Sequence, residues 1–321
     1  MVKKAELHVH LEGTMPPALV RQLAAGNGSI IDPTTFKSET EFAWNDFWHF
    51  LDCYDKAAAA ILTKEDYRLV TYDYLARCAQ EDTIYVEMFS SPDHAAEVGM
   101  SYADHLEGIA AGIEDAYKEF GIIGRIIVTC VRHFGPERAL KVAAQFVGTP
   151  HPYVVGFGMG GDEAQFHPKD FAPAFRLVSE AGYPTTTHAG EFGGPESIRA
   201  SLKYLSVSRL GHGVRAIEDA ALIQELAEKK IPMELCPGSN VATGLYNDRR
   251  SHPFRVLMDA GCIVTLNSDD PPFFATSIGH EYEKAARNYY LSDKDLGNIT
   301  RNAIFASFCD DALKEELLAK I

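Results

Sequence analysis

The sequence predicts an α/β fold, specifically a (β/α)8 barrel of the TIM type with a helical insertion after the first strand. Three observations support this prediction: eight short β-rich runs, helical segments between most of them, and apolar runs without polar alternation. An unbroken run such as Ile126-Ile127-Val128 is typical of a parallel strand that is buried on both faces. Eight strands that alternate with helices give the count of a closed barrel.

The expected strands are distributed along the whole chain. They cover residues 5–9, 83–89, 125–131, 154–158, 184–188, 209–212, 232–236 and 263–267. Between them, two segments combine helical spacing with helix-boundary signals. The first, 137–147, begins directly after Gly135-Pro136, and the second, 217–230, ends in two lysines, which favour a helix C-terminus.

The first connection is much longer than the others, because it runs from His10 to Thr83. It must hold helices that are additional to the barrel, including an aromatic-rich segment at 44–54. We therefore expect one barrel domain over residues 1–321, with a helical lid insertion at about 14–80.

The composition excludes several classes of partner. The chain has 321 residues and a formal net charge of −15, which repels phosphate backbones, so we expect no nucleic-acid partner. No apolar run approaches the roughly 18 residues of a membrane span, and the N-terminus lacks the apolar stretch of a signal peptide. The six cysteines are scattered without a C-x-x-C pair, as in reduced proteins. We expect a cytoplasmic protein that does not bind membranes, and the oligomeric state stays open.

Unusual polar residues follow four of the expected strands. They are His8 and His10 on the first, His188 and Glu191 on the fifth, His212 on the sixth, and Asp269 with Asp270 on the eighth. Barrel enzymes carry their chemistry at this C-terminal face. His8 and His10 are two residues apart on a strand and so point to the same side. Three neutral imidazoles (His8, His10 and His188) and one carboxylate (Asp269) suit a zinc ion, provided that one position stays open for water.

A lone buried histidine is more often a core residue than a ligand, and the other histidines receive that interpretation. They are His49, His94, His105, His133, His151, His167, His252 and His280. The tandem Asp269-Asp270 has an alternative interpretation as a helix cap. Because the pair follows an apolar strand and precedes Pro-Pro, one metal ligand plus one substrate group is the better interpretation.

The motifs together resemble a known family. They are HVHLEG at 8–13, GDE at 161–163, THAGE at 187–191, GHGVR at 211–215, SN at 239–240 and NSDDP at 267–271. In this order they are similar to the adenosine/adenine deaminase branch of the amidohydrolases, over nearly the whole chain. The resemblance implies zinc bound by His8, His10, His188 and Asp269. It also implies catalytic roles for Glu191, His212 and Asp270, and a contact between Gly161 and the purine ring.

The end of the fourth strand supports one zinc ion per chain. Many amidohydrolases hold two metals bridged by a carboxylated lysine at this point. This chain has Gly158-Met159-Gly160-Gly161 there, with no lysine.

Hydrolytic deamination of a purine explains the residue types. Zinc lowers the pKa of bound water to near 7 and so supplies hydroxide. Asp270 and His212 are expected to hold that hydroxide and take its proton. Glu191 is the candidate donor to the ring N1, which requires a carboxyl group kept protonated by a water-poor pocket. Gly161 has no side chain, so its backbone N–H can approach the ring edge.

The helical insertion and Glu12 supply further residues that are expected to contact the substrate. Phe47, Trp48 and Leu51 recur at helical spacing. They form either a face packed on the barrel or, as the resemblance implies, an apolar lid over the substrate. The resemblance also puts His10 and Glu12 at the substrate.

Glu12 stands where adenosine deaminases typically carry Asp and adenine deaminases often carry Glu, whereas GDE and GHG are more similar to the nucleoside enzymes. We therefore expect deamination of adenosine and 2′-deoxyadenosine to inosine and ammonia, in purine salvage. In that expectation Glu12 accepts a hydrogen bond from a ribose hydroxyl. The alternatives are an adenine deaminase or a deaminase of a modified adenosine. AMP is disfavoured, because no Lys/Arg cluster lies near these loops. A catalytically inactive barrel that acts as a binding protein would be expected to lack a metal ligand or Glu191, and this chain lacks none of them. A metal-dependent amidase or lactonase on the same barrel is disfavoured, because the fourth strand ends in glycines and has no lysine.

Overall fold

The computed structural model describes residues 2–321, and all eight expected strands are present in it. They are β1 (Lys4–Glu6), β2 (Thr83–Ser90), β3 (Ile123–Val131), β4 (Val154–Gly160), β5 (Thr186–Ala189), β6 (Arg209–His212), β7 (Met233–Leu235) and β8 (Val264–Leu266). The expected bounds were too long for β1, β7 and β8, whose regular ladders are only 3 residues each.

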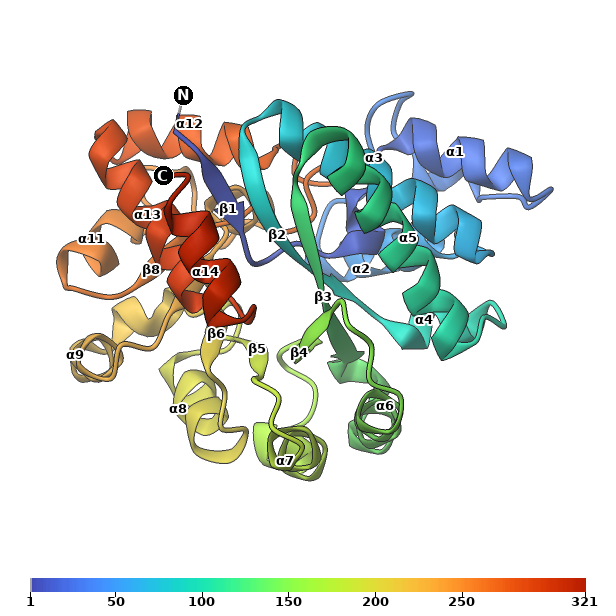
Figure 1. Ribbon diagram of the computed structural model, residues 1–321. Coiled ribbons are helices and arrows are strands. Elements are labelled where there is room, and N and C mark those ends of the chain that lie inside the picture. Colours follow the sequence, from blue (N-terminus) through green and yellow to red (C-terminus); the bar gives the residue numbers. More distant parts are fainter. Residues whose placement is uncertain (1) are drawn as a thin grey trace.

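Every strand pair is parallel, and the strands follow one another in chain order. β1–β4 and β5–β8 form two continuous runs. Single parallel bridges join the runs at both seams, Phe157 to Thr185 and Val9 to Asp269. The strands thus surround a common interior, as expected for the barrel, and helices lie around them (Figure 1).

Helices follow the strands from β2 onward. They are α4 (Pro92–Glu97) and α5 (Tyr102–Phe120), α6 (Pro136–Gly148), α7 (Ala172–Glu180), α8 (Pro195–Tyr204), α9 (Ala220–Glu228), α10 (Pro237–Ala242) and α11 (Phe254–Asp259), then α12 (Ile278–Asn288), α13 (Asp293–Ala306) and α14 (Asp311–Leu318). The predicted single helix at 217–230 is wrong at its start. A 3-10 turn ends at Glu218, and the Asp219 side chain accepts from the backbone N–H groups of Ala221 and Leu222, which caps α9.

Three helices lie between β1 and β2, as the long first connection requires: α1 (Pro17–Gly26), α2 (Phe47–Ala58) and α3 (Lys64–Gln80). A capping box at Thr63 and Asp66 starts α3, which packs along α5. α1 lies at the edge of the molecule (Figure 1). The helix α2 is the part of this insertion that reaches the functional site described below.

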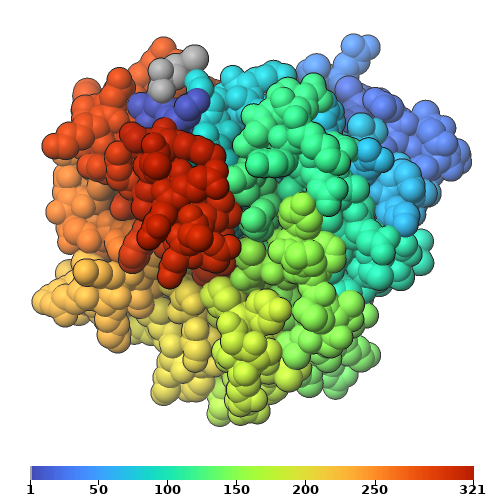
Figure 2. All heavy atoms as spheres, viewed as in Figure 1, coloured from blue at the N-terminus to red at the C-terminus, as the bar shows by residue number. Residues whose placement is uncertain are grey.

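The C-terminal helices cover the start of the barrel. Thr300 on α13 donates a hydrogen bond to the carbonyl of Lys3 at 2.7 Å. In the space-filling view α13 and α14, in red, lie beside the dark-blue N-terminal segment (Figure 2). Over residues 2–321, no helix has the length and apolar content that a membrane crossing needs. All six cysteines are buried, and none is in a disulfide within the described chain.

Candidate active site

Side chains from four strand ends meet at one mouth of the barrel. His8 and His10 follow β1, His188 lies on β5, His212 ends β6, and Asp269 follows β8. His212 and Asp269 both have positive φ, 58° and 65°, a backbone region that non-glycine residues seldom adopt. Such positions cluster at functional sites, because the surrounding structure must hold them in place.

Three imidazoles and one carboxylate form a compact group, His8, His10, His188 and Asp269. Nε2 of His188 lies 3.1 Å from Nε2 of His8 and 3.1 Å from Nε2 of His10. Oδ1 of Asp269 lies 3.4 Å from Nε2 of both His8 and His10. Ligands 2.0–2.1 Å from a tetrahedral zinc ion are about 3.3 Å apart, so these atoms have the spacing of a metal shell.

Neighbouring groups orient the rings of this cluster. Nδ1 of His8 lies 2.7 Å from Oε2 of Glu234, and Nδ1 of His188 lies 3.0 Å from the carbonyl oxygen of Met159. Each acceptor holds the ring proton on Nδ1 and leaves Nε2 free for a cation, an arrangement typical of metal-binding histidines.

The electrostatics of the cluster also favour a cation. Burial lowers the pKa of His188 to about 4, so this ring is neutral. Although burial opposes charge, the contacts with Asp269 and Glu234 raise the pKa of His8 to about 9. Burial also opposes ionisation of Asp269, but the hydrogen bond with His8 and the nearby histidines hold its pKa well below the usual range. The carboxylates that hold a proton on His8 equally favour a metal ion in its place.

A cavity opens at this mouth of the barrel and is lined by His10, His188 and Asp269 of the cluster. Glu191 is buried and lines the same cavity. Burial, reinforced by the charges of Asp269 and Glu163, raises the pKa of its carboxyl group well above the ordinary value. Oε2 of Glu191 lies 3.5 Å from Nε2 of His212, and the Asn240 side chain reaches Oε1 at 3.4 Å. A protonated carboxyl group beside a metal-ligand cluster can act as a general acid.

His212 is held between Glu191 and Asn240. The Asn240 amide lies 3.4 Å from Nδ1 of His212, and Nε2 of His252 lies 3.1 Å from Oδ1 of Asn240. Burial and the neighbouring His8 lower the pKa of His212 well below its usual value. A neutral imidazole in this position can accept a proton.

Asp270 also lines the cavity, and its Oδ1 has no hydrogen-bond partner among residues 2–321. The backbone at Gly13 makes room for it, since a Cβ there would lie 1.7 Å from Oδ1 of Asp270. A buried carboxylate oxygen without a protein partner is available to a ligand or water.

The loop after β4 supports the loop that carries Glu191. Glu163 accepts hydrogen bonds from the backbone N–H groups of Gly190 (2.6 Å), Glu191 (3.0 Å) and Gly193 (2.8 Å). Gly161 lines the cavity with φ of 95°, and a Cβ there would lie 2.8 Å from Nδ1 of His133. The Gly-Asp-Glu motif therefore combines a cavity wall without a side chain with an anchor for the neighbouring loop.

Glu12 is buried, and its carboxylate accepts from four protein groups. Ser90 donates to Oε1 at 2.6 Å, and the Ser91 N–H, Tyr67 and Tyr54 hydroxyls each donate at 3.2 Å. Glu12 reaches the cavity wall, but Oε1 accepts three of these bonds and Oε2 accepts one, so the protein uses most of its acceptor capacity.

The insertion helix α2 covers one side of the cavity with Phe47 and Leu51, together with Phe50 and Tyr54. Phe47 contacts Phe192, the residue after Glu191, with ring centroids 4.3 Å apart. The proposed place of Trp48 over the substrate is wrong: its surface is 56% exposed and it does not line the cavity. Trp48 lies on the outer face of α2, because adjacent helical residues point about 100° apart.

The histidine-based prediction missed two cavity residues, His94 and His133. His94 pairs with Asp55 at the rim, with Nε2 3.1 Å from Oδ1. His252, also assigned to the core, contacts Asn240. His94 and His252 lie at no strand end, so strand-end position gave no signal for them, whereas His133 follows β3 by two residues and that criterion could have found it. Glu234 and Cys236 were missed although both sit at the end of β7.

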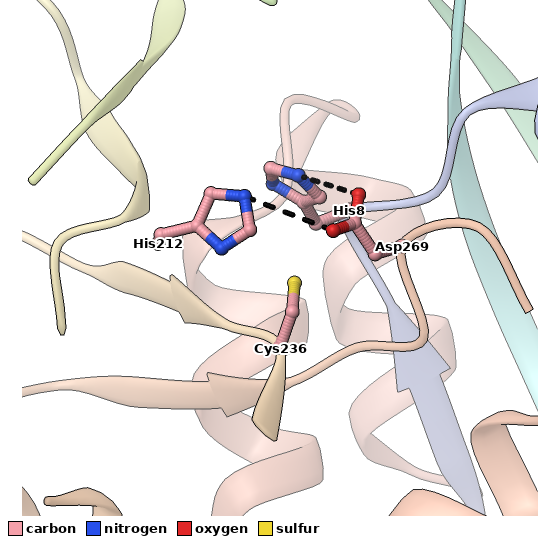
Figure 3. A group of neighbouring side chains, drawn as sticks. All are labelled: His8, His212, Cys236 and Asp269. Carbon is pink, nitrogen blue, oxygen red and sulfur yellow. Dashed lines mark ion pairs between the residues drawn. The ribbon is translucent and has the colours of Figure 1, made fainter. Parts of the chain in front are cut away.

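A second group of ligand-type side chains lies beside the first. It consists of His8, His212, Cys236 and Asp269, all buried. Figure 3 shows the Cys236 sulfur and the His212 ring directed toward the same space as His8 and the Asp269 carboxylate.

A parallel α/β barrel with a metal-ligand cluster and a buried carboxyl group at its C-terminal mouth defines a metal-dependent hydrolase of the amidohydrolase type. The profile of the family described as adenosine deaminase matches residues 3–321. The chain belongs to that family.

Individual relatives share the full length of the chain. A protein from Agrobacterium fabrum named adenine deaminase is 46% identical over 318 residues, covering 99% of this chain and 97% of its own. Another adenine deaminase, from Chelativorans sp., is 46% identical and covers 100% of this chain and 98% of its own. The crystal structure of an adenine deaminase from Arthrobacter aurescens superposes with a TM-score of 0.92 at 29% identity, covering 100% of this chain and 98% of that one. A zinc-bound amidohydrolase from Burkholderia ambifaria superposes with a TM-score of 0.89 at 25% identity, covering 99% and 89%.

These relatives correct the expected substrate. Eight full-length relatives at 42–46% identity are named adenine deaminase, so the preference for adenosine was wrong. The structure explains why the GDE motif at 161–163 and the GHG motif at 211–213 wrongly suggested a nucleoside substrate. Glu163 anchors backbone N–H groups, and Gly211 makes room for His8, whose Cε1 would lie 3.0 Å from a Cβ there. Both motifs therefore reflect the packing of the site and say little about the sugar.

Proposed function

We propose that this chain deaminates adenine hydrolytically to hypoxanthine and ammonia, with one divalent metal ion, zinc, per chain. One observation carries the proposal: the buried Glu191 carboxyl group, with its raised pKa, faces the same cavity as His10, His188 and Asp269. The names of the full-length relatives support adenine as the purine.

The metal would be held by His8, His10, His188 and Asp269, whose donor atoms are spaced for it. When bound, it lowers the pKa of water and so provides a nucleophile near neutral pH.

The chain's own residues supply the remaining steps. Glu191 keeps its proton near neutral pH and donates it to N1 of the ring, which makes C6 electrophilic. His212 and Asp270 orient the attacking water, and the neutral His212 accepts its proton. Gly161 offers its backbone N–H to the ring edge.

Glu12 supports the free base over the nucleoside. A carboxylate that already accepts four hydrogen bonds has little capacity for a ribose hydroxyl. The apolar side of the cavity, formed by Phe47, Phe50 and Leu51, suits a flat ring and excludes water from it. The buried, unpaired thiols support a reducing compartment such as the cytoplasm.

The deciding experiment compares kcat/KM for adenine, adenosine and 2′-deoxyadenosine under one set of conditions, with elemental analysis of the same preparation. We expect adenine to lead both nucleosides by about 100-fold or more, since sites that exclude a group discriminate strongly. We also expect about one equivalent of zinc. Equal activity on adenosine, or two tightly bound metal ions per chain, contradicts the proposal.

A further inference from the structure

A carboxylate and an imidazole at the rim of the cavity have no part in the proposed reaction. Asp55 on α2 and His94 on α4 both line the cavity, and Oδ1 of Asp55 lies 3.1 Å from Nε2 of His94. We propose that Asp55, held by His94, accepts a hydrogen bond from N9–H of adenine and thereby selects the free base. This inference rests on the proposed function and assigns the residue that distinguishes adenine from its nucleosides.

The Asp55 carboxylate is held on one side and accessible on the other. Its side chain is 42% exposed, whereas that of His94 is 10% exposed. Among residues 2–321, His94 is the only hydrogen-bond partner of this carboxylate, so its second oxygen can accept from a ligand. Although burial opposes a charge on His94, the hydrogen bond with Asp55 and the charge of Glu12 raise the pKa of the ring. The proton therefore stays on Nε2, and Asp55 acts as an acceptor.

The helix α2 spans the cavity from the proposed acid to this pair. At its start, the Phe47 ring lies 4.3 Å from the ring of Phe192, the residue after Glu191. Asp55 comes more than two helical turns later, roughly 12 Å along the helix axis. Asp55 therefore lies at the end of the α2 wall that is remote from Glu191.

The orientation of adenine in the proposed reaction directs N9 toward that end. N9 is bonded to C4, which lies across the six-membered ring from N1, so a base whose N1 meets Glu191 points N9 away from Glu191. Gly161, at the ring edge, adjoins His133, whose Nδ1 would lie 2.8 Å from a Cβ there. Burial lowers the pKa of His133, and the nearby charge of Asp55 opposes that shift. Gly161 and His133 thus connect the purine edge to Asp55.

This contact separates the free base from its nucleosides. In adenosine N9 carries the sugar in place of hydrogen, so the carboxylate would be covered without receiving a donor. Sites that hydrogen-bond a substrate N–H discriminate strongly against analogues that lack it. Glu12 cannot replace Asp55 in this role, because protein donors already use most of its acceptor capacity.

The test compares adenine with 9-methyladenine, in which a methyl group replaces the N9 hydrogen, on zinc-loaded holoenzyme. Wild type should prefer adenine by about 100-fold in kcat/KM. Asp55→Ala should lower kcat/KM for adenine by about 10- to 100-fold, because a hydrogen bond to a charged group is lost. The loss should appear mainly in KM, since the contact is present in both ground state and transition state. The value for 9-methyladenine should stay within about threefold of wild type.

Asp52→Ala is the matched control on the same helix. Asp52 pairs with Lys56 at 2.6 Å and does not line the cavity, so its variant should keep the wild-type preference. His94→Ala should reduce the preference for adenine less than Asp55→Ala and add little in the double variant, because His94 acts by positioning Asp55. Asp55→Asn keeps the side-chain shape and should show a smaller loss in the same direction, and zinc content and Tm check that each variant is folded.

An unchanged preference in both Asp55 variants overturns the proposal, as does an equal loss of activity on adenine and 9-methyladenine. Calorimetric titration of holoenzyme with hypoxanthine and 9-methylhypoxanthine tests the contact without turnover. Wild type should bind hypoxanthine at least about tenfold more tightly, and Asp55→Ala should bind the two equally. Equal binding of both to wild type also overturns the proposal. A chain inactive on adenine that still shows the Asp55-dependent preference refutes the proposed reaction and supports the contact, which separates the two failures.

Discussion

Glu234 accepts a hydrogen bond from Nδ1 of His8 at 2.7 Å, with both side chains fully buried. Arg209 pairs with the other oxygen of Glu234 and also with Glu87, 2.6 Å from its Nη1. A buried arginine thus holds two carboxylates inside the barrel, and only one of them touches a metal-binding residue. Side chains from β2, β6 and β7 therefore act together to orient the His8 ring.

Glu234→Gln should weaken metal binding by about 10- to 100-fold, because the amide holds the His8 ring less firmly and carries no charge. A chelator-competition titration measures this affinity. Glu87→Gln is the control, since it also breaks a buried pair with Arg209 but does not touch His8. It should lower the free energy of unfolding by about 3–5 kcal/mol and leave metal affinity unchanged. Equal losses of affinity in both variants would mean that Glu234 acts through the fold alone.

Asp269 and Asp270 are neighbours with different environments, so their variants should differ. Asp269→Ala removes an oxygen from the ligand cluster and should lose most of its metal. Asp270→Asn should retain metal and lose turnover, because Asp270 lines the cavity but does not belong to the ligand cluster. Metal content by elemental analysis and kcat on adenine separate the two. Loss of metal from both would refute this division of roles.

Glu191→Gln should lower kcat by about 10²–10⁴-fold while metal stays bound, since the amide keeps the shape but cannot donate a carboxyl proton. A variant with a tenth of wild-type activity would exclude Glu191 as the acid.

The pH profile offers an independent check on the same residue. Glu191 donates only when protonated, and its pKa is raised by burial, so activity should persist through neutral pH and fall as pH rises through that pKa. The profile of kcat for adenine should therefore show a loss on the alkaline side. A loss of activity between pH 4 and 5 on raising the pH, where an ordinary glutamate ionises, would mean that the pKa is not raised.

Glu12 should behave as a structural anchor. Glu12→Leu leaves the donors of Tyr54, Tyr67 and Ser90 unpaired in a buried place and should lower the free energy of unfolding by at least about 2 kcal/mol. Glu12→Gln keeps one acceptor oxygen and should cost less. In urea unfolding the two variants should rank in that order. The ratio of kcat/KM for adenine and adenosine in Glu12→Gln should stay near that of wild type, and a hundredfold change would instead make Glu12 a specificity residue.

Phe47 and Trp48 provide a matched pair on α2. Phe47→Ala removes the contact with Phe192 beside Glu191 and opens the apolar side of the cavity, so kcat/KM for adenine should fall by about tenfold or more. Trp48→Ala removes an exposed ring and should change kcat/KM little. Steady-state kinetics on both variants test the lid. A larger effect from Trp48→Ala would place the substrate contact on the other face of the helix.

Elements set by local pattern were predictable. Strand segments such as 126–128 are buried on both faces and so are apolar, and the eighth strand ends where Asn267-Ser268-Asp269-Asp270 interrupts the apolar run. Strand-end position also predicted that His8, His188 and Asp269 converge, since parallel strands of a barrel end at one face. The predicted start of the helix at 217–230 was wrong, because the Asp219 side chain accepts hydrogen bonds from the following backbone N–H groups and so begins the helix at Ala220.

The sequence by itself determined the barrel, the strand order and the cluster at the strand ends, because each depends on the periodicity and chain position of the residues concerned. Only the tertiary structure decided what surrounds each polar group. Glu12 is bound by donors from α2, α3 and the end of β2, and His133 and His94 enter the cavity from loops and helices. Cys236 meets His212 and Asp269 from neighbouring strands. Whether a carboxylate or a thiol is occupied or free depends on side chains tens to hundreds of residues away, and no local spacing encodes those contacts.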